Sequence, residues 1–283
     1  VFDEPFFYHS DISTLFLFKI AKKKIKVALS GDGSDEQYYG YRRYIKANKI
    51  YNIGNFLNNR FKQTLQSLLK KIPSFNNSYL LKNIERYLKN SHDPQLFYNE
   101  ILKMNFENLL NLNKENSNEI LKFDDIDKNI NFNEFMMLHD LNYYLTNDIL
   151  VKTDRASMNS GLEVRLPFLD IDLVSYNYSF LFEKNYSHRN KKNLFKEILK
   201  KYVPKELINN KKIGFGAPVD FLIKGDLKSW AIDLLSKENL SKNYIQNTDI
   251  IQKKLSDHLS GKKNHRDAIW NLIIFQNWMV ENA

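Results

Sequence analysis

The ten residues from Val27 to Glu36 constrain the fold of this chain more than any other stretch. A short apolar run at 25–29 ends at Ser30, and two glycines with acidic neighbours follow before a helical pattern begins. This is the order of a buried strand, a turn and a helix start. Because ligands sit at the carboxyl ends of strands in parallel α/β sheets, the turn is a candidate binding loop.

The two glycines of the turn favour close contact with a ligand. Gly31 and Gly33 have no Cβ and leave the backbone accessible. Ser34 or Asp35 is placed to cap the following helix, whose amino terminus favours anions such as phosphate. A short Gly-x-Gly pattern is a weak signal by itself. The alternative is an ordinary loop with a helix cap.

Apolar spacing predicts helices over most of the remaining chain. They are expected at 10–24, 35–50, 56–72, 79–88, 94–104, 105–112, 133–151, 191–202, 204–208, 226–235, 249–259 and 266–281. Residues 113–131 are rich in Asn and acids and predict a surface loop. With one predicted strand among many helices, the chain is expected to be α/β but mostly helical, with the edge of a sheet in its first fifty residues.

Composition excludes several classes of protein. The absence of cysteine rules out disulfides, thiolate metal sites and a cysteine nucleophile within these 283 residues. No apolar run approaches the roughly 18 residues of a membrane span, and no signal peptide opens the chain. We therefore expect a cytoplasmic protein with no membrane partner. The net charge of +9 is spread along the chain, which indicates a solvated Lys-rich surface and no nucleic-acid partner.

Three segments interrupt the helical pattern and combine charged residues with glycines or structural breaks. They are residues 30–36, 152–165 and 211–217. Binding residues cluster on loops that rigid elements hold in place. We therefore expect these three segments to meet in one pocket.

The same segments resemble the synthetase domain of glutamine-hydrolysing asparagine synthetases. The matching motifs are SGDGSDE at 30–36, KTDRASM at 152–158 with LEVRLPFLD at 162–170, and KIGFGAP at 212–218. The resemblance implies the carboxyl-terminal part of a Rossmann-like PP-loop synthetase domain. Residues 1–50 would be an edge of its nucleotide-binding core and residues 51–283 the helical part of the same domain.

The resemblance also implies a reaction. ATP, with Mg²⁺, would activate the side-chain carboxylate of aspartate as an acyl-adenylate and release pyrophosphate. Ammonia from an amino-terminal glutaminase domain, absent from this chain, would then attack to give asparagine and AMP. Related enzymes act on other carboxylates, so a sugar acid of surface-polysaccharide biosynthesis is the alternative acceptor. A homodimer is a further possible partnership.

Residues of the first motif take separate roles in this interpretation. Ser30, Gly31 and Gly33 match the family's ATP contacts, and a hydroxyl with open backbone N–H groups can hold phosphate. Asp32 matches an acid of the adenylation step that orients a reactant or accepts a proton; the alternative is a turn aspartate. Asp35 matches a magnesium ligand, because Mg²⁺ prefers oxygen ligands beside phosphates; the alternative is a plain helix cap.

The later motifs supply positive charge. Lys212 matches a catalytic lysine that neutralises the α-phosphate or pyrophosphate, a role that suits a flexible point charge. Lys152, Asp154 and Arg155 would line the same pocket around substrate and pyrophosphate.

Glu163 and Arg165 leave two interpretations open, a place in the pocket or a structural ion pair. The family's Ser-Gly-Gly-x-Asp-Ser loop and its cysteine nucleophile do not occur here. Since Val1 to Phe7 resembles the interior of a longer sequence, we expect a truncated synthetase domain that is inactive alone. Two non-enzymatic alternatives are a basic module that binds nucleic acid and a helical scaffold.

Overall fold

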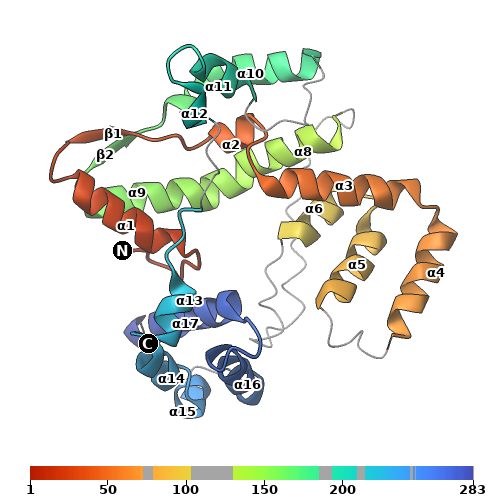
Figure 1. The fold of residues 1–283 in the computed structure, drawn as a ribbon, viewed down its shortest axis with the longest axis vertical. Coiled ribbons are helices and arrows are strands. Elements are labelled where there is room, and N and C mark those ends of the chain that lie inside the picture. The colour runs from red at the N-terminus through yellow and green to blue at the C-terminus, as the bar shows by residue number, and fades with distance from the viewer. Residues whose placement is uncertain are drawn as a thin grey trace.

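The computed structural model describes residues 1–72, 79–102, 130–184, 193–208, 214–242, 245 and 247–282. These residues form many helices and one small parallel sheet, as expected for a mostly helical α/β chain (Figure 1). The helices are α1 (Ser10–Ala21), α2 (Ser34–Gln37), α3 (Arg42–Phe56), α4 (Asn59–Lys70), α5 (Tyr79–Asn90), α6 (Pro94–Leu102), α8 (Phe132–His139), the π-helix η3 (Asp140–Ile149), α9 (Leu150–Asn159), the 3-10 turn η4 (Pro167–Leu169), α10 (Ile171–Lys184), α11 (Asn193–Leu199), α12 (Lys205–Ile208), α13 (Val219–Lys224), α14 (Lys228–Leu234), α15 (Lys237–Lys242), α16 (Thr248–Leu259) and α17 (Arg266–Asn282). The strands are β1 (Val27–Leu29) and β2 (Glu163–Arg165).

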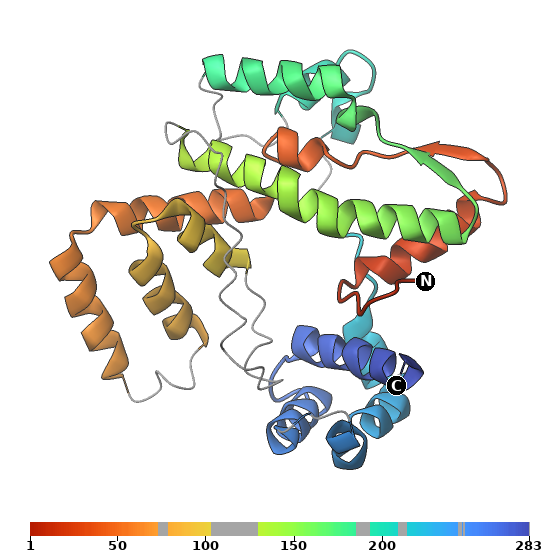
Figure 2. The same ribbon diagram turned by 180° about the vertical axis from the view of Figure 1, so that it is seen from behind.

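Helices α8, η3 and α9 follow one another without a break and cross the middle of the molecule as one long rod (Figure 2). The rod begins with a capping box, in which the Asn131 side chain and the Glu134 side chain each accept a backbone N–H of the other residue. The rod ends just before Gly161, whose φ of +64° is a left-handed conformation that glycine adopts readily. The expected break at 152–165 is therefore wrong in its first half, because the helix predicted to end at residue 151 continues to Asn159.

Strands β1 and β2 pair in parallel, with Val27 opposite Glu163 and Leu29 opposite Arg165. The second strand escaped prediction because its three residues have no apolar run. The expectation that β1 is buried is also wrong. Ala28 faces a small cluster around α1 and α9, whereas Val27 and Leu29 point the other way and are 48% and 75% exposed.

The helix expected at 35–50 is divided in two. Helix α2 ends at Gln37 and α3 begins at Arg42. Tyr39 lies between them with a φ of +54°, a left-handed conformation unusual for a tyrosine. Its hydroxyl donates to Asn133 Oδ1 at 2.8 Å. Burial of the aromatic side chains against α8 thus overrides the helical pattern, and Gly40 lies in the connection and not inside a helix.

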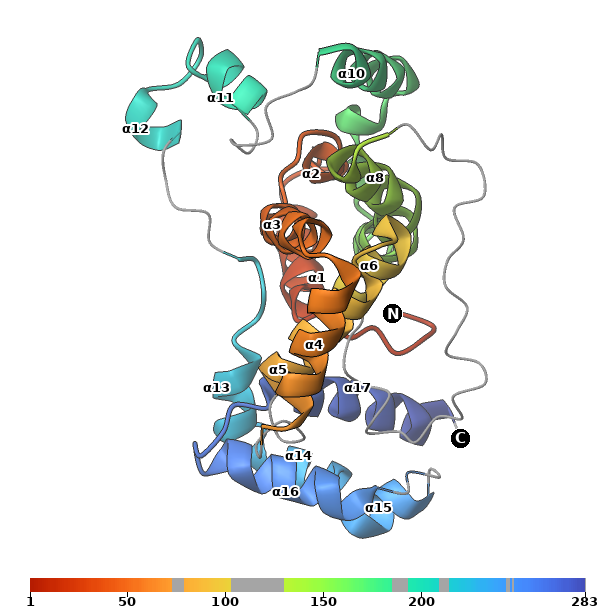
Figure 3. The same cartoon turned by 90° about the vertical axis from the view of Figure 1, so that its right-hand side faces the viewer.

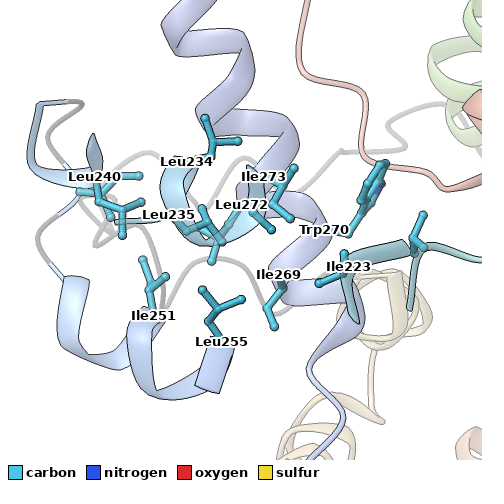
Figure 4. Close-up of a cluster of buried hydrophobic side chains, with 13 residues drawn as sticks. Ile223, Leu234, Leu235, Leu240, Ile251, Leu255, Ile269, Trp270, Leu272 and Ile273 are labelled. Carbon is cyan, nitrogen blue, oxygen red and sulfur yellow. The ribbon is translucent and has the colours of Figure 1, made fainter. Parts of the chain in front are cut away.

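Two large apolar cores hold the helices. One joins α13 to α17, which gather at one end of the molecule (Figure 3), and its buried side chains include Ile223, Leu235 and Trp270 (Figure 4). The other is aromatic, is built from α3, α6 and α8, and includes Tyr44 and Phe97.

The remaining helical predictions agree with the described elements to within a few residues at each end. The predicted helix at 105–112 and the predicted loop at 113–129 lie outside the described residues. Within the described part of the chain, no helix combines the length and the apolar character needed to cross a membrane.

Candidate active site

The first motif forms the turn between β1 and α2. Ser30 continues the strand pairing, since its N–H donates to the Arg165 carbonyl at 2.9 Å. Gly31 is exposed, so its backbone is open to a ligand. Gly33 caps α2 with a φ of +86°, and a Cβ there would lie 2.3 Å from Leu169 Cδ2. The turn therefore requires glycine at Gly33 both for conformation and for space.

A hydrogen bond joins the first motif to the second. Thr153, buried on α9, donates its hydroxyl to Asp32 Oδ2 at 2.9 Å. This contact bridges 121 positions of sequence. It fixes one oxygen of a half-exposed carboxylate at the carboxyl end of β1, and the sequence interpretation missed Thr153 because a threonine in a helical run carries no distinctive signal.

The residues next to Thr153 on α9 contact different parts of the structure. Lys152 donates to the Ser10 hydroxyl at 3.2 Å, at the start of α1. Arg155 lies 3.5 Å from an oxygen of Asp3. Asp154 is exposed. The hydrogen bond to Thr153 thus links Asp32 to α9. The placement of Lys152, Asp154 and Arg155 around a bound substrate stays a prediction.

The third motif approaches the same region from the carboxyl-terminal half. Lys212 lies outside the described residues. The end of its loop is described, and the Ala217 N–H donates to the His9 carbonyl at 3.0 Å. Since Lys152 contacts Ser10, the next residue along, the three predicted motifs are connected by direct contacts through the start of α1.

Asp35 occupies the first turn of α2 and is half-buried. Its backbone carbonyl accepts the Gly40 N–H at 2.8 Å, which closes the end of α2. The described residues hold no group of three or more acids or histidines that would bind a metal alone. Mg²⁺ commonly takes one or two carboxylates and completes its shell with phosphate and water, so Asp35 fits as a single protein ligand.

Glu36, next to Asp35, is buried and accepts the Tyr41 hydroxyl at 2.5 Å. Burial raises the pKa of Glu36, and the hydrogen bond from Tyr41 opposes this only in part. On the other side of α2, Gln37 donates to the Gly33 carbonyl at 3.2 Å and accepts from Asn177 at 2.9 Å. These contacts hold α2, and therefore the turn, in place.

A buried ion pair lies behind the turn. Both Arg43 Nη2 and Arg43 Nε donate to Asp140 Oδ2, at 2.5 and 3.1 Å. The Tyr98 hydroxyl donates to the same oxygen at 2.8 Å, and the guanidinium lies over the rings of Tyr41 and Tyr144. Burial alone would raise the pKa of Asp140, but hydrogen bonds and the Arg43 charge hold it below its ordinary value.

Glu163 and Arg165 form the ion pair that one of the two interpretations predicted. Both side chains are more than half exposed, so the pair stabilises the strand only slightly.

Comparison with known proteins identifies the class to which this fold and site belong. The sequence pattern of the asparagine synthase family matches residues 1–280. The chain therefore belongs to the asparagine synthase family, which confirms the resemblance drawn from the motifs.

Individual relatives agree with this assignment. The chain is 26% identical over 296 residues to asparagine synthetase [glutamine-hydrolyzing] 1 of Bacillus subtilis, covering 98% of this chain and 44% of that protein. It is 24% identical to a putative asparagine synthetase of Mycobacterium tuberculosis, over 98% of this chain and 42% of the relative. A putative asparagine synthetase of Methanocaldococcus jannaschii is 32% identical over 165 residues, 56% of this chain and 30% of the relative.

The chain thus spans less than half the length of each of these relatives. No solved structure matches the chain.

Proposed function

We propose that this chain is part of an enzyme that forms an amide by ATP-dependent activation of a carboxylate, with aspartate as the acceptor. A carboxylate oxygen attacks the α-phosphorus of ATP, and the bond to the β-phosphate breaks to release pyrophosphate. Ammonia then attacks the acyl carbon, loses a proton, and expels AMP to leave asparagine. The ammonia would come from a glutaminase domain, as the names of the relatives suggest.

The observation that carries this proposal is the hydrogen bond between Thr153 and Asp32. It brings two of the three motifs together at the carboxyl end of β1, where parallel α/β sheets place their ligands. The contact between Ala217 and His9 joins the third motif to the residue before Ser10, which Lys152 of the second motif contacts. Motifs that are far apart in sequence and adjacent in space are what a shared active site requires.

The geometry suggests a role for each residue of the turn. Thr153 fixes Asp32 Oδ2, which leaves the other oxygen to orient the substrate or accept its proton. Ser30, Gly31 and Gly33 would present N–H and hydroxyl groups to phosphate, and Lys212 would neutralise the charge that builds there. Mg²⁺, when bound at Asp35, would offset the charge of the leaving pyrophosphate.

A Rossmann-like PP-loop core, the boundary near residue 50 and a homodimer are parts of the proposal that rest on the family. The family match over residues 1–280 supports the first of these, and the boundary and the homodimer rest on the resemblance alone.

Exchange of labelled pyrophosphate into ATP tests the proposal. In the complete gene product, exchange should depend on aspartate, and Asp32→Asn should lower it by about 100-fold. Thr153→Val should lower it by about fivefold, the effect of one lost hydrogen bond. Asp226→Asn, a change at an exposed acid, should leave the rate unchanged.

The 283-residue chain alone should show no exchange. Aspartate-dependent exchange by this chain alone would contradict that expectation. Exchange that depends on a sugar acid and not on aspartate would replace the proposed acceptor.

A further inference from the structure

A cavity of about 560 Å³ lies beside η3 and the segment that precedes α1. Five aromatic residues contribute to its wall, namely Phe6, Phe7, Tyr8, Tyr143 and Tyr144. The volume is within the range of small-molecule sites in proteins, and such sites combine an aromatic wall with a few polar groups.

Asp148 is the polar group in this wall whose position requires explanation. It is 8% exposed, and among the described residues only the Tyr8 hydroxyl reaches its carboxylate as a donor, without the geometry of a full hydrogen bond. A buried carboxylate without a donor is unfavourable. Burial accordingly raises the pKa of Asp148, although Lys152 and Tyr8 lie close enough to oppose the effect.

A second buried acid lies close to Asp148. Asp11, on α1, is 5% exposed, and among the described residues only the Tyr8 backbone reaches its carboxylate as a donor, without the geometry of a full hydrogen bond. Asp11 and Asp148 repel one another, and the ammonium of Lys152 is the cation that attracts both. That ammonium is hydrogen-bonded to Ser10, so Lys152 is shared between the two acids.

Arg43 also faces the cavity, but its attraction for Asp148 is the smallest of the effects that lower the pKa of that acid. Its guanidinium is held by Asp140, at 2.5 Å. His139 lines the cavity too, and it lies 3.7 Å from the same acid. The remaining charged residue of the wall is Glu4, which makes the cavity more negative.

The helix that carries Asp148 has unusual geometry. Residues Asp140–Ile149 form a π-helix, which is rare in proteins and occurs frequently at functional sites. Its wider turns place Tyr143, Tyr144 and Asp148 in one wall.

We propose that this cavity binds a small organic ammonium ion, a protonated primary amine on an apolar or aromatic body. The ammonium group donates to the carboxylate of Asp148 and adds positive charge to the little that Lys152 and Arg43 provide there. The body packs against the aromatic wall, which includes Phe6 and Tyr8. This proposal does not depend on the proposed amide-forming activity.

Calorimetric titration of the 283-residue chain at neutral pH tests the proposal with three probes that share a phenyl ring and differ in charge. Benzylammonium should bind, whereas benzyl alcohol and benzoate should bind at least about tenfold more weakly, since they lack the charged donor. Asp148→Asn should weaken benzylammonium binding by about tenfold or more. Asp172→Asn, at an exposed acid on α10, should leave it unchanged.

Circular dichroism establishes whether each variant is folded. If Asp148→Asn does not fold, the comparison of the three probes on the unaltered chain decides the question. Failure of benzylammonium to bind at millimolar concentration, equal binding of the alcohol, or full affinity in a folded Asp148→Asn variant would overturn the proposal.

Discussion

The buried ion pair of Arg43 and Asp140 gives the sharpest prediction about stability. Asp140→Asn keeps the shape of the side chain and removes its charge. Asp140 is fully buried and accepts three hydrogen bonds at Oδ2, two from Arg43 and one from Tyr98. After the change, the guanidinium remains in place with no opposite charge.

Removal of one partner from a buried ion pair typically destabilises a protein by about 3–5 kcal/mol. Arg43 retains some contact with water, as its side chain is 24% exposed, and the rings of Tyr41 and Tyr144 still contact it. Both features place the expected loss near the lower limit, at about 3 kcal/mol.

Urea unfolding followed by far-ultraviolet circular dichroism measures this loss. Glu163→Gln is the matched control, because it removes one charge from an ion pair that is more than half exposed, and it should change the free energy of unfolding by less than about 1 kcal/mol. A loss below about 1 kcal/mol in Asp140→Asn, or equal losses in the two variants, would refute this reasoning.

Three further expectations concern stability. Gly33→Ala should destabilise the chain by about 1–2 kcal/mol, measured by urea unfolding, because φ stays at +86° even if the Leu169 side chain moves away; an unchanged midpoint would contradict it. Asn131→Ala removes the capping box at the start of the central rod and should cost about 1 kcal/mol in the same assay. Burial raises the pKa of Asp11 to about 7, above the value of about 3.9 in an unfolded chain. The folded chain therefore binds this proton more tightly, so this contribution to stability should decrease as pH rises from about 4 to about 7. Asp11→Asn should flatten that part of the profile in urea unfolding at a series of pH values, and a slope identical to that of the unaltered chain would argue against it.

The sequence predicted those features that depend on local pattern. Helical spacing located most helices, and the turn after 25–29 was placed correctly between a strand and a helix. The ion pair of Glu163 and Arg165 was one of two interpretations, and the structure contains it.

Features that depend on distant contacts were not predictable in this way. Strand β2 has only three residues, and its pairing with β1 across 136 positions defines it as a strand (Val27 opposite Glu163). The break at Tyr39 follows from aromatic burial against α8. The acids at Asp140 and Asp148 sit in an ordinary helical pattern, and only the fold shows that both are buried.

The exposed side of the small sheet has a consequence for the chain in solution. Leu29 is 75% exposed, and Phe16 and Ile20 of the neighbouring helix α1 are each 61% exposed. A short, uncovered strand with apolar side chains presents both unpaired backbone groups and an exposed hydrophobic surface to other molecules. The isolated chain should therefore associate reversibly as its concentration increases, more strongly in sulfate and less strongly on cooling, as expected for contacts driven by the release of water.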